Sequence, residues 1–85
     1  MSERRYPVCS GKDVVHALES IGYQKKSQKG SHVKMIKFYE SEKHIIVIPL
    51  HKELDKGTLS SIVRKVSKYY PKEKLIEILK IGRKK

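Results

Sequence analysis

The sequence predicts one α+β domain: a helix, three antiparallel strands, a second helix and a short C-terminal helix, with the helices on one face of a three-stranded sheet. Apolar residues recur with helical spacing in both terminal parts of the chain, and a stretch rich in β-branched and aromatic residues lies between them. The predicted strands are joined by short polar links, which favours an antiparallel meander. A chain of 85 residues suits a single domain, with a core over about residues 6–80 and a basic tail over residues 81–85.

The segment SGKDVVHALESIGY, residues 10–23, carries both a start and a stop signal for the first helix. Ser10 can cap the N-terminus, with Asp13 three residues later. Gly22 supplies the left-handed residue that commonly ends a helix. The apolar stripe between these signals consists of Val14, Ala17, Leu18 and Ile21.

The three strands are predicted over residues 23–28, 32–40 and 45–48, with a turn at 29–31 and a hairpin loop at 41–44. Pro49 ends the third strand because it has no amide hydrogen for the ladder. Strand alternation separates the second strand into two sets, which are His32, Lys34, Ile36 and Phe38 on one side and Val33, Met35, Lys37 and Tyr39 on the other. Both sets mix apolar and polar residues, so the pattern leaves open which side the helices cover.

The second helix is predicted from its apolar face, with Thr58 as its N-terminal cap. That face consists of Leu59, Ile62, Val63 and Val66. Pro71 interrupts the pattern and suits the first turn of a further short helix. The buried residues of this last helix are expected to be Leu75, Ile78 and Leu79.

The charge of the chain is strongly positive. Twenty Lys and Arg residues against nine Asp and Glu residues give a formal net charge of +11. Such an excess attracts polyanions, and it recurs along the whole chain. Nucleic acid fits this charge best, while an anionic membrane surface, an acidic protein partner and simple solubility remain alternatives.

The cysteine and hydropathy patterns indicate a reducing, cytoplasmic setting. Cys9 is the only cysteine, so neither an intramolecular disulfide nor a thiolate metal site is expected. The N-terminal residues lack the apolar run of a signal peptide. The longest apolar run, Ile45 to Ile48, is far too short to span a bilayer, and no membrane partner is expected.

The stretch QKGSHVK, residues 28–34, is the main candidate for chemistry. His32 can take and give a proton near neutral pH, Lys29 and Lys34 can hold phosphate charge, and Ser31 can donate a hydrogen bond to a phosphate oxygen. RNA carries its own nucleophile, the 2′-hydroxyl, so one histidine with lysines suffices to cleave it. The alternative is that His32 is simply a polar residue at the start of a strand.

Two further positions extend this candidate site. In an antiparallel meander the end of the third strand lies beside the beginning of the second, so His51 can approach His32. It can equally be a loop histidine in solvent. Lys56 precedes the second helix, whose N-terminus is a potential phosphate site. No third residue with ligand spacing accompanies the two histidines, so neither a metal nor another cofactor is expected.

Four pieces of the sequence together resemble the HicA (YcfA-like) family of toxins over about residues 6–80. A first helix ends in Gly22-Tyr23, and Gly30-Ser31-His32 follows. A strand then closes as Val-x-Pro-x-His over residues 47–51, and Gly-Thr-Leu at residues 57–59 leads into a helix. Each piece alone is unspecific, but their order and spacing make the resemblance strong.

The resemblance implies a double-stranded-RNA-binding-like fold and an mRNA interferase whose catalytic residue is the histidine of Gly-Ser-His, here His32. It also implies an antitoxin partner, HicB, that covers the active site. Two positions differ from the family pattern. Ser27 stands where members often have Arg, and Val33 stands where they often have a second His.

The leading hypothesis is therefore a toxin that acts as a metal-independent RNA endonuclease. His32 would act as general acid or base, and RNA would be bound by Lys29, Ser31, Lys34, His51 and Lys56. The alternative is a double-stranded-RNA-binding module without catalysis, which would share the charge and the fold but release no product from any RNA.

Overall fold

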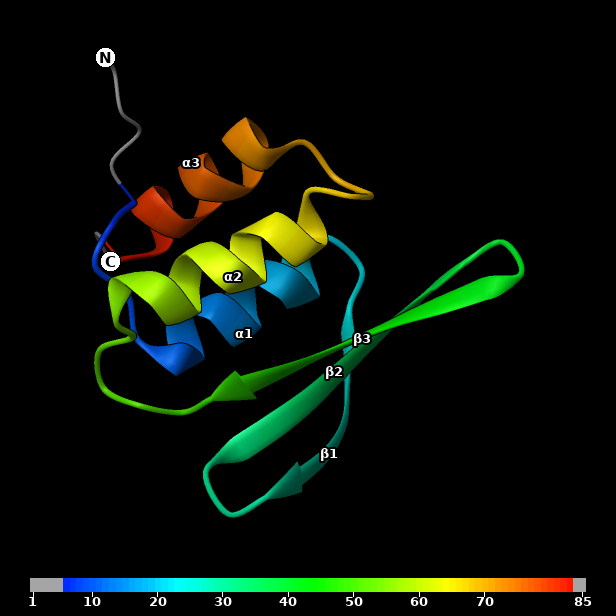
Figure 1. Ribbon diagram of the computed structural model, residues 1–85, viewed down its shortest axis with the longest axis horizontal. Coiled ribbons are helices and arrows are strands. Elements are labelled where there is room, and N and C mark those ends of the chain that lie inside the picture. The colour runs from blue at the N-terminus through cyan, green and yellow to red at the C-terminus, as the bar shows by residue number, and fades with distance from the viewer. Residues whose placement is uncertain (1–5, 84–85) are drawn as a thin grey trace.

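The computed structural model describes residues 6–83 of the chain, and its element order confirms the predicted α+β fold. All three helices lie on the same side of the three-stranded sheet (Figure 1). The elements are α1 (Gly11–Ser20), β1 (Gln24–Lys29), β2 (His32–Tyr39), β3 (Glu42–Pro49), α2 (Lys56–Val66) and α3 (Lys72–Arg83). Within residues 6–83, no helix is long and apolar enough to cross a bilayer.

The sheet is an antiparallel meander with β2 in the centre. Val33 lies opposite Ile48 and Met35 lies opposite Ile46, and all four side chains are buried. This register decides what the alternation in β2 left open. The helices cover the side that carries Val33 and Met35, and the side that carries His32 is left uncovered.

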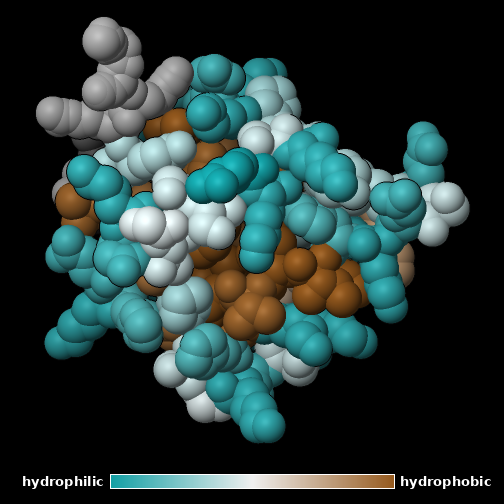
Figure 2. Space-filling model, in the orientation of Figure 1, coloured by the Kyte–Doolittle hydropathy of each residue, from teal (hydrophilic) through white to brown (hydrophobic). Residues whose placement is uncertain are grey.

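The core forms where the apolar stripes of the helices meet the covered side of the sheet. Burying a large aliphatic side chain contributes about 1.5–3 kcal/mol, so this layer supplies most of the stabilisation. Figure 2 shows hydrophilic side chains over much of one view of the surface, with an apolar area between α2 and β3. The most deeply buried helix residues are Val14, Leu18, Leu59, Val63, Val66, Leu75 and Leu79.

The start of α1 packs directly against the end of β3. Ser10 and Asp13 form the predicted capping box, each side chain accepting a hydrogen bond from the other residue's backbone amide. The amide of Gly11 donates to the carbonyl of His51 over 2.9 Å. A Cβ atom at Gly11 would lie 2.0 Å from the carbonyl oxygen of Pro49, so only glycine permits this approach.

The hairpin between β2 and β3 is tighter than predicted. Residues 41–44 were expected to form its loop, but Tyr39 pairs with Glu42 and only Glu40 and Ser41 form the turn. Glu40 adopts a φ of 52°, a left-handed conformation that usually selects Gly or Asn. Because glutamate gives no signal for such a turn, the sequence pattern placed the loop too late.

Two helix boundaries also differ from the prediction. Asp55, not Thr58, caps α2, because its side chain accepts a hydrogen bond from the Thr58 amide over 2.9 Å. The last helix was expected to be short, but α3 spans 12 residues and is longer than α1 or α2. It includes residues 81–83 of the expected basic tail, and residues 84–85 lie outside the described part.

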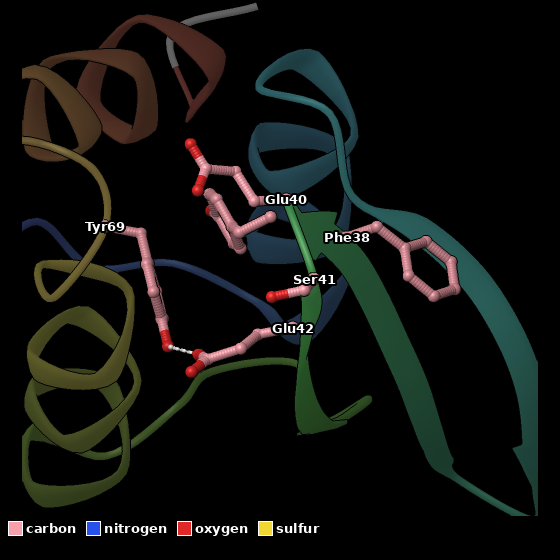
Figure 3. Close-up of a pocket in the computed structure, with 6 residues that line it drawn as sticks. Phe38, Glu40, Ser41, Glu42 and Tyr69 are labelled. Carbon is pink, nitrogen blue, oxygen red and sulfur yellow. Dashed lines mark hydrogen bonds between the residues drawn. The ribbon is translucent and has the colours of Figure 1, made fainter.

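The extension of β3 carries His44 into a cluster of tyrosines. Tyr23, only 2% exposed, lies with its hydroxyl 2.7 Å from Nδ1 of half-buried His44, and the hydroxyl of Tyr39 donates to that of Tyr23. Tyr39 stacks on Tyr69, which donates a hydrogen bond to Glu42 (Figure 3). Burial, with added repulsion from Lys68 and Lys65, holds the pKa of His44 below its ordinary value of 6.5.

We predict that Gly11→Ala lowers the free energy of unfolding by at least about 2 kcal/mol, because the new methyl group collides with rigid backbone at Pro49 and Leu50. Urea denaturation measures this loss. Gly57→Ala is the matched control, since no atom lies within 4 Å of a Cβ at that position in α2. It should leave stability unchanged or raise it by up to about 1 kcal/mol. Equal effects of the two substitutions would refute the close approach.

We predict that the free energy of unfolding falls as the pH drops below about 6.5, because unfolding restores the ordinary pKa of His44 and so takes up a proton. Protonation in the folded state leaves Nδ1 without a lone pair, so the Tyr23 hydroxyl cannot donate to it. The measurement is urea denaturation at several pH values for the wild type and His44→Gln. The variant should lose less stability on acidification, and parallel pH profiles would contradict the assignment.

Candidate functional site

His32 lies at the start of β2, on the side of the sheet that the helices leave uncovered. Its cross-strand neighbours are Lys29 in β1 and Pro49 in β3. Directly opposed residues of paired strands project to the same face, so the imidazole of His32 and the ammonium group of Lys29 share this face. Both side chains are exposed to solvent.

The turn before His32 leaves open space for a ligand. Gly30 adopts a φ of 59°, and no atom lies within 4 Å of the position where a Cβ would stand. The Gln28 side chain donates to the Gly30 carbonyl over 3.0 Å and so braces the turn from within. Ser31 is exposed beside His32, where its hydroxyl can reach a bound phosphate.

Lys34 extends the site along β2. It is exposed, and it lies two residues beyond His32 on the same face of the strand. In the neighbouring strands it opposes Ser27 and Val47. Lys29 and Lys34 therefore place two ammonium groups near His32 at this end of the uncovered face.

His51 lies in the chain segment that follows β3. The amide of Leu50 donates to the carbonyl of Ser31 over 2.6 Å, so the segment after β3 runs beside the turn that precedes His32. The hydrogen bond from Gly11 to the His51 carbonyl anchors the same segment to α1. Exposed His51 thus lies near the His32 end of the sheet, with its imidazole free of the core.

The N-terminus of α2 is less open to phosphate than the sequence suggested. Side-chain and backbone hydrogen bonds from Thr58, followed by the nearby charge of His51, lower the pKa of the Asp55 carboxyl. Its carboxylate already occupies the Thr58 amide. Lys56 is exposed at the first residue of the helix, but a phosphate there would meet this negative charge.

The structure therefore groups four of the predicted residues, Lys29, Ser31, His32 and Lys34, around the β1–β2 turn, places His51 beside them and sets Lys56 apart at the start of α2. This group offers one proton-transferring side chain with ammonium groups and a hydroxyl near it. Among residues 6–83, no three His, Cys, Asp or Glu side chains lie close enough together to hold a metal ion.

The sequence interpretation missed residues at the far end of the same face. Lys43 was assigned to a loop, but it lies in β3 opposite Phe38. Phe38 itself was placed on the His32 side of β2, yet the pattern could not show that this side is uncovered. The residues that decide the question are Ile46 and Ile48, whose alternation with exposed Ile45 and Val47 is hidden in an unbroken aliphatic run.

The chain matches a family model. The model described as HicA toxin of bacterial toxin-antitoxin matches residues 11–67, which is more than half of the chain and runs from α1 to the end of α2. The matched range contains every predicted site residue. Searches of curated proteins and of solved structures found no match.

Proposed function

The chain belongs to the HicA toxin family of bacterial toxin–antitoxin systems, and we propose that it acts there as an endonuclease that cleaves RNA without a metal ion. The observation that supports this function most strongly is the position of His32. An exposed imidazole stands on the uncovered face of the sheet, with Lys29 across the strand pair and Lys34 two residues along β2.

In the proposed reaction the substrate's 2′-oxygen attacks the neighbouring phosphorus and the 5′-oxygen leaves. The 2′-hydroxyl must lose a proton and the leaving 5′-oxygen must gain one. His32 carries out one of these transfers, as general base or general acid, and water carries out the other. Lys29 and Lys34 stabilise the extra negative charge that develops on the phosphate oxygens in the transition state.

The remaining predicted residues serve binding in this proposal. Ser31 donates a hydrogen bond to the phosphate, and His51 extends the cationic edge beside the turn. Lys56 contributes longer-range attraction, because the Asp55 carboxylate already occupies the nearest helix amide. A net charge of +11 would draw RNA to the protein and make binding sensitive to salt.

Membership of a toxin–antitoxin family implies a protein antitoxin as a partner. We propose that this antitoxin is HicB-like and that it inhibits the toxin by covering His32. A cytoplasmic location would suit both an mRNA substrate and a chain whose one cysteine, Cys9, is buried.

We predict that His32→Ala slows RNA cleavage by about 10²- to 10⁴-fold, the usual contribution of general acid–base catalysis, while it still folds and binds RNA. Purified wild type and variant are incubated with a long RNA, and the products are separated on a gel. The matched control is His16→Ala, which removes an exposed histidine from α1. Cleavage by His32→Ala at the wild-type rate would eliminate the proposed mechanism. An absence of product from the wild type would instead favour a non-catalytic RNA-binding module.

We also predict that EDTA leaves the cleavage rate unchanged, because the proposed chemistry needs only an imidazole and ammonium groups. The assay uses the same long RNA with and without EDTA at constant ionic strength. Loss of cleavage in EDTA, with recovery after addition of Mg²⁺ or Zn²⁺, would show that a metal ion takes part.

A further inference from the structure

The uncovered face of the sheet has a composition that catalysis by His32 does not explain. Residues that pair across the strands form rows on this face. The rows at both ends of the face contain lysines, and no row contains a carboxylate. Apolar side chains lie between these lysines. The rows are Lys29–His32–Pro49, Ser27–Lys34–Val47, Gln24–Ile36–Ile45 and Phe38–Lys43.

The apolar part of this face is unusually exposed. Phe38 is 68% exposed, Val47 48% and Ile45 39%. Ile36 is only 7% exposed among them and forms the floor of the patch. Exposed apolar patches of this kind usually mark a binding surface, since each side chain loses the stabilisation that burial would give.

The ring of Phe38 is exposed and lies outside the hydrophobic core. It lies on the opposite side of the β2–β3 hairpin from Tyr69 and points away from the tyrosine cluster (Figure 3). Lys43 is its direct cross-strand neighbour. An aromatic face beside an ammonium group can stack on a nucleobase while the lysine holds the adjoining phosphate.

We propose that the uncovered face binds the unpaired strand of an RNA substrate, with Phe38 stacking on a base and Lys34 and Lys43 holding the backbone on the way to His32. This inference rests on the proposed function and adds the form of its substrate. His32 and Phe38 lie six residues apart in one strand, so they are separated by about 20 Å. The bound strand therefore extends several nucleotides from the scissile phosphate.

Paired RNA would not use this face in the same way. An A-form duplex presents phosphates, 2′-hydroxyls and the edges of stacked bases, so the Phe38 ring would have no base face to contact. A single strand can splay its bases onto an aromatic side chain. A protein partner with apolar and acidic side chains is the competing occupant, but stacking on a base requires the ring of Phe38, whereas protein packing requires only its apolar volume.

The test measures RNA binding by fluorescence anisotropy in the His32→Ala background, where cleavage does not interfere. The probes are an unstructured RNA of about twelve nucleotides and a blunt duplex of the same length. Phe38→Leu removes the ring but keeps an apolar side chain, Phe38→Tyr retains the ring, and Ile81→Ala removes an exposed apolar residue from α3. Circular dichroism confirms that each variant is folded.

Phe38→Leu should weaken binding of the single strand by about 5- to 100-fold, while Phe38→Tyr and Ile81→Ala leave it unchanged. Lys43→Gln should reduce the slope of log affinity against log salt by about 0.7. This variant tests the same surface if Phe38→Leu fails to fold. Equal binding by Phe38→Leu, or tighter binding of the duplex, would overturn the proposal. If Phe38→Leu weakens the binding of a co-expressed antitoxin but not that of RNA, the face binds a protein instead. RNA cleavage is measured separately with proteins that retain His32. The proposed nuclease activity and the proposed RNA-binding face can therefore fail independently.

Discussion

Within residues 6–83, the helices bury only one face of the three-stranded sheet (Figure 1). Three helices pack on the side that carries Val33, Met35, Ile46 and Ile48, and no other helix or strand of the described residues covers the opposite side. That opposite side faces solvent although it carries β-branched residues, which β-strands favour. Lysines at the two ends of this face, Lys29 and Lys34 at one end and Lys43 at the other, help to keep it soluble, and the same charges make the face attractive to a polyanion.

Close backbone contacts hold the chain segments of the candidate site together at one end of the sheet. Gly11 lets α1 begin against Pro49, and the Leu50–Ser31 hydrogen bond holds the chain after β3 beside the turn before His32. Three segments far apart in the sequence thus meet at the end of the sheet that carries His32. The opposite end is fixed by a different interaction, in which Tyr23, Tyr39 and Tyr69 surround neutral His44.

The sequence predicted the element order, the central strand and the turn around Gly30, because apolar periodicity and glycine positions indicate these features directly. It could not assign the covered side of β2, since that depends on the register with Ile46 and Ile48 in a run where every residue is aliphatic. It misplaced the hairpin because Glu40 carries no sequence signal for a left-handed turn. It could not predict the exposure of the Phe38 ring, because that exposure depends on tertiary structure.

In the proposed reaction, His32 transfers a proton while the 2′-oxygen of the substrate attacks the phosphorus. The most direct measurement is the chemistry of the RNA ends that the wild-type protein produces, read by mass spectrometry of a short cleaved oligonucleotide. Attack by the 2′-oxygen predicts a 2′,3′-cyclic phosphate on one fragment and a 5′-hydroxyl on the other, and no cleavage where the 2′-hydroxyl is replaced by hydrogen. A 5′-phosphate with a 3′-hydroxyl, or cleavage at the deoxy position, would show that water is the nucleophile and would contradict this account.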